Sequence, residues 1–163
     1  MLEIRAATEE DVPLILHFIR ALAEYERLLP KVVADEQKVR ATLFGNPRFA
    51  EVILAEEDGT PAGFALFFHN YSTFLAAPGI YLEDLFVEPQ YRGRGYGKAL
   101  LMRLARIAKE RQCGRLEWAV LDWNQSSIDF YRALGAAGLD DWRIFRLTGD
   151  ALDALASKGV THG

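Results

Sequence analysis

The spacing of apolar residues along the chain predicts strands and helices in a mixed order. Apolar and polar residues alternate over residues 2–5, as in a half-buried strand, whereas between Val12 and Ala23 the apolar positions recur every three or four residues, as on one helix face. Over the whole chain, these two periods predict strands at 2–5, 52–56, 62–69, 80–87, 116–121 and 142–147, and helices at 12–23, 35–44, 96–111 and 149–157, with another helix from Asn124 or Ser126 to Gly135.

The strand expected at residues 80–87 is apolar on both faces, which is typical of a strand in the centre of a sheet. The element order β-α-α-β-β-β-α-β-α-β places antiparallel neighbours in the first half and a strand–helix–strand unit later. The predicted fold class is therefore mixed α/β, with a central, largely antiparallel sheet flanked by helices. No repeat, low-complexity tract or linker interrupts the chain, so residues 1–163 are expected to form a single domain.

A basic, glycine-rich loop joins this central strand to the next helix, with the sequence Arg92-Gly93-Arg94-Gly95-Tyr96-Gly97-Lys98. Glycine lets the backbone come close to a ligand, and the first turn of a helix offers unpaired N–H groups and a partial positive charge. Together with the basic side chains, these features predict a binding site for a phosphate-bearing ligand. A solvated connection between strand and helix would have the same composition.

The spacing of the loop excludes two common phosphate-binding motifs. The NTPase loop needs a glycine where Arg92 stands and a hydroxyl side chain where Ala99 stands. The dinucleotide motif G-x-G-x-x-G does not match either, because Gly93, Gly95 and Gly97 are evenly spaced. The phosphate-bearing ligand is therefore expected to belong to a third class.

Composition and charge exclude several kinds of function. The 163 residues suffice for a hydrophobic core, and the single cysteine, Cys113, allows neither an internal disulfide nor a cysteine-built metal site. The net charge of −4 argues against nucleic acid as a partner, because nucleic-acid binding depends on clustered Lys and Arg. No apolar run approaches the ~20 residues that span a bilayer, and no signal-peptide pattern opens the chain, so we expect no membrane partner and a cytoplasmic location.

The pattern Arg92-x-x-Gly95-x-Gly97 resembles the pyrophosphate-binding loop of the GNAT superfamily of acyl-CoA-dependent N-acetyltransferases, and the element order matches that superfamily over essentially the whole chain. Residues 23–26, 81–87, 122–131 and 142–145 are similar to the diamine (spermidine/spermine) N-acetyltransferases and their bacterial relatives. The resemblance implies a GNAT fold, acetyl-CoA as co-substrate without a metal, and a homodimer. It also implies direct acetyl transfer, in a ternary complex, to a primary amine of a small cationic acceptor such as a polyamine, a diamine or a lysine analogue.

The resemblance implies a role for each site residue. Tyr131 would contact the cofactor and act as the general acid that protonates the leaving thiolate, and Glu83 would bind the cationic amine and relay its proton through water. The backbone of Leu85, Phe86 and Val87 would meet the thioester, where a β-bulge would point an N–H at the carbonyl oxygen. The other implied contacts are the pyrophosphate with the loop from Arg92 to Lys98, the CoA arm with Asn124, and the acceptor with Tyr25, Glu26, Glu117 and Trp118.

The residues themselves leave structural explanations open. Tyr131 shares an apolar helix stripe with Ile128 and Leu134, so it could be a core residue. Glu83 and Asp84 are neighbours on a strand and would face opposite sides of it unless a bulge intervenes, so Asp84 is expected in a salt bridge or a backbone hydrogen bond. Ordinary core packing would also explain Leu85, Phe86, Val87 and Trp118.

The identity of the acceptor stays open at this level. Between Leu134 and Trp142 the chain is shorter than its eukaryotic relatives, in which this stretch carries an acid that contacts the polyamine; Asp140 or Asp141 would replace that acid. A protein or peptide amine and an aminoglycoside are alternative acceptors. A catalytically silent CoA-binding regulatory module is another alternative, against which the presence of Tyr131, Glu83 and the glycine loop argues.

Overall fold

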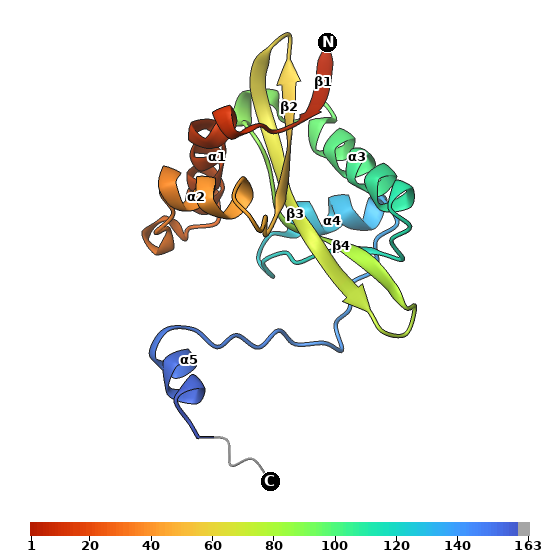
Figure 1. The fold of residues 1–163 in the computed structure, drawn as a ribbon. Coiled ribbons are helices and arrows are strands. Elements are labelled where there is room, and N and C mark those ends of the chain that lie inside the picture. Colours follow the sequence, from red (N-terminus) through yellow and green to blue (C-terminus); the bar gives the residue numbers. More distant parts are fainter. Residues whose placement is uncertain (160–163) are drawn as a thin grey trace. The chain divides into compact units, whose positions relative to one another are not determined.

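The computed structural model describes residues 1–159, which fall into two units, Met1–Leu121 and the described part of Asp122–Gly163 (Figure 1). The first unit contains β1 (Leu2–Ala6), α1 (Val12–Tyr25), α2 (Glu36–Leu43), β2 (Glu51–Glu57), β3 (Thr60–Ser72), β4 (Ala77–Val87), α3 (Tyr96–Glu110) and β5 (Leu116–Trp118), with short 3₁₀ turns at Glu9–Asp11, Leu29–Lys31 and Pro89–Tyr91. The second unit contains α4 (Gln125–Ala133) and α5 (Gly149–Ala156). The single domain expected for residues 1–163 stays a prediction.

The first unit is built on one five-stranded sheet with the strand order β1-β2-β3-β4-β5. Neighbouring strands run antiparallel except β4 and β5, which run parallel. β4 lies between β3 and β5, as its apolar residues on both faces predicted. The predicted mixed α/β class, with a largely antiparallel sheet flanked by helices, is confirmed.

Helices cover both faces of this sheet (Figure 1). On the face under α1 and α2, Phe18 of α1 stacks on Phe64 of β3 with ring centroids 5.2 Å apart, and both side chains are fully buried. Burying a side chain of this size contributes roughly 2–3 kcal/mol, so the contact anchors α1 over the sheet. α3 covers the other face with the buried residues Leu100, Leu101, Leu104 and Ile107. In the part of the chain that the structure describes, no helix is both long and apolar enough to cross a membrane.

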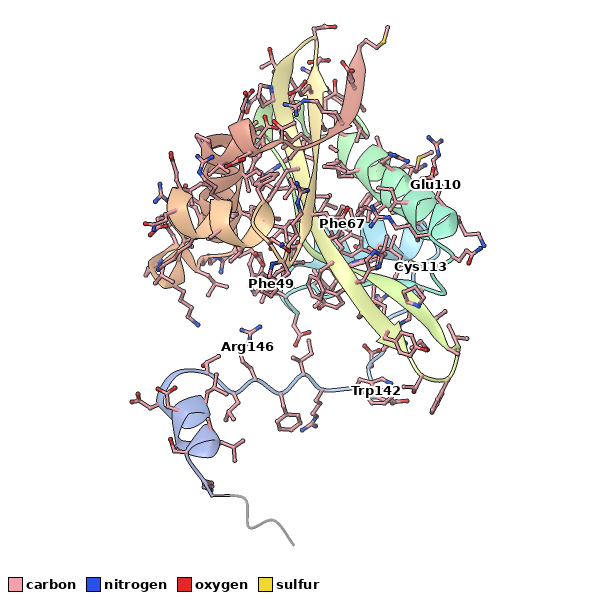
Figure 2. The ribbon with its side chains drawn as sticks, viewed as in Figure 1. Phe49, Phe67, Glu110, Cys113, Trp142 and Arg146 are labelled. Atoms are coloured by element: carbon pink, nitrogen blue, oxygen red, sulfur yellow. The ribbon has the colours of Figure 1, made fainter. Side chains whose placement is uncertain are left out.

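The strand predicted at residues 142–147 is not formed, which corrects the last element of the predicted order. This segment of the second unit is irregular; Figure 2 labels Trp142 and Arg146 there. The alternating pattern describes which side chains are apolar, but a strand also needs a neighbour that satisfies its backbone N–H and C=O groups. The strand expected at residues 116–121 is also shorter, because β5 ends at Trp118.

Candidate functional site

β4 loses its neighbour on one edge partway along its length. β5 pairs with β4 only as far as Leu82, so beyond that residue β4 is paired, within residues 1–159, with β3 alone. The Glu88 N–H donates to the Ala62 carbonyl oxygen at 2.8 Å, and antiparallel strands alternate hydrogen-bonded and non-hydrogen-bonded positions. The N–H and C=O groups of Leu85 and Val87 therefore point away from β3, toward the unpaired edge, where an extended ligand can pair with them.

A β-bulge interrupts β4 just before this unpaired edge. Leu82 is opposite Phe67 and Asp84 is opposite Leu66, so Glu83 is an extra residue with no partner on β3. The sequence predicted a bulge among residues 85–87, and the structure places it earlier in the strand, at Glu83. Because an extra residue breaks the strict alternation of a strand, Glu83 and Asp84 need not face opposite sides of the sheet.

Three carboxylates, Glu26, Glu83 and Asp84, form an acidic cluster at this bulge. Glu26 follows the last residue of α1, and the charge of Glu83 acts on both Glu26 and Asp84. Burial raises the pKa of Asp84, and the charges of Glu83 and Glu26 raise it further, to about 7. Burial and the charge of Glu83 also raise the pKa of Glu26. The cluster therefore favours a cation, and it can hold a proton near neutral pH.

The environment of Asp84 differs from the one expected from the sequence. Among residues 1–159, the Asp84 carboxylate forms neither the salt bridge nor the backbone hydrogen bond predicted for it, and Leu66 is its cross-strand neighbour. A half-buried carboxylate without a cationic partner keeps its proton more readily, because the charged form is poorly solvated. Asp84 thus joins Glu83 in the candidate site, although the alternation of a regular strand predicts the opposite.

The glycine loop needs glycine at two positions because of its backbone. Gly93 and Gly95 have φ values of +77° and +83°, which side chains rarely adopt, and a Cβ at either position would meet no atom within 4 Å. Gly95 is the N-cap of α3, and no side chain caps the first turn. The first N–H groups of α3 therefore lack helical partners and face an open surface, which is the arrangement that binds anions. Gly97 has an ordinary backbone, and its Cβ would lie 3.9 Å from a methyl group of Val87.

Arg92 is held by protein groups at the end of β4. Its Nε donates to the carbonyl oxygen of Val87 at 2.9 Å. Its guanidinium carbon lies 5.0 Å from the ring centroid of Tyr25 and 5.3 Å from that of Phe86, both within the range of a cation–π contact. Arg92 thereby links the glycine loop to the end of α1 and to the unpaired edge of β4. The Phe86 side chain is buried in the core, as one of the alternatives from the sequence proposes.

The other two basic residues of the loop, Arg94 and Lys98, are both exposed, and Arg94 forms an ion pair. Arg94 forms an ion pair with Glu57 at 3.0 Å, and its guanidinium lies over the ring of Tyr91. The Tyr96 hydroxyl donates to the same Glu57 carboxylate at 2.5 Å. Lys98, in the first turn of α3, is exposed. Arg92, Arg94 and Lys98 are the three cations predicted to meet a pyrophosphate. Within residues 1–159, Lys98 is the one of them that forms neither an ion pair nor a cation–π contact.

Glu117 lies outside the acidic cluster. Its carboxylate pairs with Arg115 Nε at 2.7 Å and accepts a hydrogen bond from Asn70 Nδ2 at 3.1 Å. Trp118, the last residue of β5, is half-buried. The structure brings Glu26, which the sequence analysis predicts as an acceptor contact, beside Glu83, and gives Glu117 partners of its own.

Asn124 and Tyr131 belong to the second unit, where both lie in or beside α4. The Asn124 side chain caps α4 by accepting a hydrogen bond from the Ser127 N–H at 3.3 Å, which confirms one of the two predicted caps. Tyr131 is half-buried, with its ring 5.5 Å from that of Phe130. The predicted roles of Asn124 at the CoA arm and of Tyr131 as general acid stay predictions, as do those of Asp140 and Asp141.

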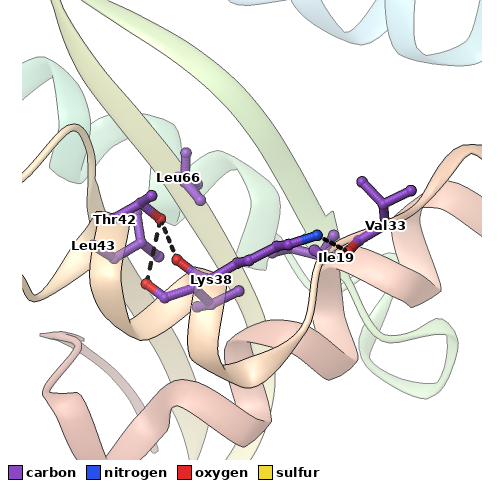
Figure 3. Close-up of a pocket in the computed structure, with 8 residues that line it drawn as sticks. Ile19, Val33, Lys38, Thr42, Leu43 and Leu66 are labelled. Carbon is purple, nitrogen blue, oxygen red and sulfur yellow. Dashed lines mark hydrogen bonds between the residues drawn. The ribbon is translucent and has the colours of Figure 1, made fainter.

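An apolar groove of about 320 Å³ opens between α1, α2 and β3 (Figure 3). Its lining consists of Ile19, Val33, Ala34, Lys38, Val39, Thr42, Leu43 and Leu66. Leu66 is the residue paired with Asp84, so the groove adjoins the acidic cluster. The sequence analysis missed the groove, because its residues come from four separate segments and each segment follows an ordinary core pattern.

Residues 1–159 contain no group of three His, Cys, Asp or Glu side chains arranged to hold a metal ion. Cys113 is buried, and its Sγ lies 3.9 Å from His69 Nδ1, a neighbour that is distant in the sequence. His69 is also contacted by Arg111, which pairs with Glu51. These residues form a polar cluster at one end of α3, separate from the acidic cluster on β4.

Comparison with known proteins gives matches over most of the chain. Residues 17–136 match the model of the acetyltransferase (GNAT) family. A thialysine N-epsilon-acetyltransferase from Bos taurus is 40% identical, over 95% of this chain and 97% of the relative, and an L-ornithine N5-acetyltransferase from Arabidopsis thaliana is 36% identical, over 96% and 89%. The solved structure of an integron cassette protein from the mobile metagenome of V. cholerae superposes with a TM-score of 0.81 at 28% identity, over 96% of this chain and 98% of that one.

Relatives of this kind fit the diamine N-acetyltransferase subfamily that the sequence resembles, and both curated relatives are N-acetyltransferases. The family match covers the acidic cluster, the unpaired edge of β4, the glycine loop and α4. The chain belongs to the GNAT family of acetyltransferases.

Proposed function

We propose that this protein transfers the acetyl group of acetyl-CoA directly to a primary amine of a small cationic acceptor, in a ternary complex. The observation that carries the proposal is the acidic cluster of Glu26, Glu83 and Asp84 beside the unpaired edge of β4. An acceptor amine bound by the carboxylates would lie next to the unpaired edge of β4. The backbone N–H and C=O groups of that edge can pair with the extended arm that carries the thioester. The names of the two curated relatives, which act on thialysine and ornithine, support a small amine as acceptor.

The donor would lie along the unpaired edge and the glycine loop. The amide groups of the pantetheine arm can pair with the N–H and C=O groups of Leu85 and with the N–H of Val87, much as another strand would. The pyrophosphate can bind the first-turn N–H groups of α3, where the helix dipole favours negative charge and Lys98 adds a cation. An N–H at the unpaired edge can also donate to the thioester oxygen as negative charge develops on it.

The acidic cluster would bind the amine and remove its proton. An ammonium group has a pKa far above neutral pH, so it must lose a proton before its nitrogen can attack. Asp84, with a pKa of about 7, can accept that proton through Glu83 or water. The nitrogen then forms a bond to the carbonyl carbon, and the carbon–sulfur bond breaks as the CoA thiolate takes a proton from Tyr131. The nitrogen releases its second proton, and a proton from solvent restores the phenol of Tyr131. The products are the acetylated amine and free CoA.

The proposal is tested by incubating the protein with acetyl-CoA and each of a panel of acceptors and measuring the release of free CoA thiol. The panel consists of putrescine, spermidine, ornithine, lysine, a peptide with a free N-terminal amine, and an aminoglycoside. We expect thiol release with the small polycationic or diamino acceptors and little with the peptide. Preference for the peptide or the aminoglycoside would overturn the proposed acceptor class. CoA binding in calorimetry without thiol release for any acceptor would identify a silent CoA-binding module instead.

A further inference from the structure

We propose that the protein also transfers straight-chain acyl groups longer than acetyl, such as butyryl and hexanoyl, and that their alkyl chain lies in the groove between α1, α2 and β3. This inference rests on the proposed function and widens its donor class from acetyl-CoA to short-chain aliphatic acyl-CoA. It depends on the apolar lining of the groove, on the position of the groove beside the thioester site, and on the charges that keep a cationic acceptor out of it.

The groove presents mainly apolar side chains to a ligand. Six of its eight lining residues are apolar, and they come from α1, α2, β3 and the connection between the two helices. The two polar residues use polar atoms within the protein. Thr42 Oγ1 donates to the backbone carbonyl oxygen of Lys38 at 2.8 Å, and Lys38 Nζ donates to that of Val33 at 3.2 Å (Figure 3). Burial of an alkyl chain against such a lining is favourable, whereas a polar chain would lose its water there.

The groove begins one strand away from the site proposed for the thioester. The unpaired edge of β4 starts at the bulge, and Asp84, directly after the bulge residue, is paired with Leu66, which lines the groove. Neighbouring strands are about 5 Å apart, so a chain that leaves the edge over this face of the sheet must cross about that distance to reach Leu66. An acetyl group is too short for this, whereas a hexanoyl chain, with carbon–carbon bonds of about 1.5 Å, can cross it.

Charge keeps the acceptor out of the groove. Glu26, Glu83 and Asp84 attract an ammonium group to the acidic cluster. None of the eight described residues that line the groove is acidic, so an ammonium would lose water there without gaining an anion. It would also meet the ammonium of Lys38, and like charges repel. The acceptor amine and the alkyl chain of the donor therefore have separate places, and both can be bound at the moment of transfer.

The chemistry with a longer donor is the reaction already proposed. The amine nitrogen forms a bond to the acyl carbonyl carbon, and the carbon–sulfur bond breaks as the CoA thiolate takes up a proton. Overall, an alkylammonium and an acyl-CoA give an amide, free CoA thiol and one proton released to solvent. No further reactant is needed, so the length of the acyl chain is the only variable of the test.

Calorimetry without an acceptor tests the place of the alkyl chain, because the donor alone undergoes no transfer. The probes are acetyl-CoA, butyryl-CoA and hexanoyl-CoA. Each fully buried methylene strengthens binding by about fourfold, so we expect the wild-type protein to bind hexanoyl-CoA at least about tenfold more tightly than acetyl-CoA, with butyryl-CoA between them. Ala34→Leu fills part of the groove and should bring this ratio of affinities close to one. Ile19→Phe fills the groove from α1 and should do the same, which keeps the test available if one variant does not fold.

Two controls separate filling of the groove from other effects. Ala105→Leu, the same substitution at an exposed position on α3, should keep the wild-type ratio. Lys38→Met keeps the lining apolar and should keep the ratio as well, because an alkyl chain needs no cation. A ratio that is lost in Lys38→Met would mean that the groove binds a charged group, and would overturn the inference.

Thiol release with ornithine and putrescine as acceptors tests the transfer itself. We expect kcat/KM of the wild-type protein with hexanoyl-CoA to equal or exceed kcat/KM with acetyl-CoA. A lower value, equal affinities of the wild-type protein for the two donors, or a ratio that persists in Ala34→Leu and Ile19→Phe would overturn the inference and leave the proposed function standing. Failure of acetyl-CoA to release thiol with every acceptor would instead contradict the proposed function.

Discussion

Arg92 donates a hydrogen bond from Nε to the carbonyl oxygen of Val87, 2.9 Å away, and so connects the glycine loop to the last residue of β4. The same guanidinium lies between the rings of Tyr25 and Phe86. The residue that begins the Arg-x-x-Gly-x-Gly pattern thus holds together the end of α1, the unpaired edge and the loop. We infer that Arg92 positions the site, and that the backbone of the loop supplies most of the groups for a phosphate.

Arg92→Ala should lower the free energy of unfolding by about 1–2 kcal/mol, because it removes a hydrogen bond and two cation–π contacts at a largely exposed site. Urea denaturation measures this change. Arg106→Ala, at an exposed position on α3, is the matched control and should change stability by less than about 0.5 kcal/mol. Equal effects of the two substitutions would show that the contacts of Arg92 add nothing to stability.

Gly95→Val should weaken CoA binding by at least about tenfold, because a β-branched residue cannot easily adopt φ +83° and the first turn of α3 would move. Calorimetry with CoA measures the affinity. Gly59→Val has the same kind of backbone, with φ +79° and open space, but lies in the turn between β2 and β3. It should cost stability without a comparable loss of CoA binding, and an undiminished affinity in Gly95→Val would contradict the placement of the pyrophosphate.

The stability of the protein should depend on pH through Asp84. The pKa of Asp84 is raised from 3.8 to about 7, so between these values the folded protein holds a proton that the unfolded chain has released. The contribution of this group to stability is therefore complete below about pH 4 and is lost as the pH rises through about 7. Asp84→Asn removes the effect, so its stability relative to the wild type should increase from pH 4 to pH 8 by up to about 4 kcal/mol.

Denaturation curves at several pH values measure this difference. Asp150→Asn, at an exposed position in the first turn of α5, is the control and should follow the wild-type profile at all pH values. Wild-type and Asp84→Asn profiles that run parallel from pH 4 to pH 8 would mean that Asp84 titrates like an ordinary exposed acid.

Glu83→Gln should raise KM for the amine and leave CoA affinity nearly unchanged, because the side chain belongs to the acidic cluster and not to the glycine loop. The same substitution removes a charge that raises the pKa of Asp84, so the rise of kcat/KM with pH should move to lower pH. Steady-state kinetics across pH test both effects. Equal losses of amine use and CoA binding would place Glu83 outside the acceptor site.

Tyr131→Phe should lower kcat by about 100-fold and leave CoA binding nearly intact, because the phenol hydroxyl would donate the proton to the leaving thiolate. Rapid measurement of thiol release, together with calorimetry, separates turnover from binding. Phe130→Leu, the neighbouring ring in α4, is the control for packing within the helix. Unchanged turnover in Tyr131→Phe would mean that Tyr131 is a core residue of its apolar helix stripe and not the general acid.

Much of the fold could be predicted because local patterns report local structure. Helices α1, α3 and α4 follow from apolar stripes and capping residues, and β4 follows from a run that is apolar on both faces. The glycine loop could be found from spacing, since a positive φ at Gly93 and Gly95 restricts the residue type at those positions. The segment at residues 142–147 could not be settled in this way, because alternation cannot supply the neighbour that a strand requires.

The sequence by itself determined the family, the position of the glycine loop that is predicted to bind phosphate, and the candidate acids Glu26 and Glu83. Only the tertiary structure placed the bulge at Glu83, which brings Asp84 into the acidic cluster, and gave Arg92 its partners on α1 and β4. It also placed Lys38 beside the groove that adjoins Asp84. The physical reason is that residue types and periods are set along the chain, whereas strand register, burial and the charges that shift a pKa depend on neighbours that come from distant segments.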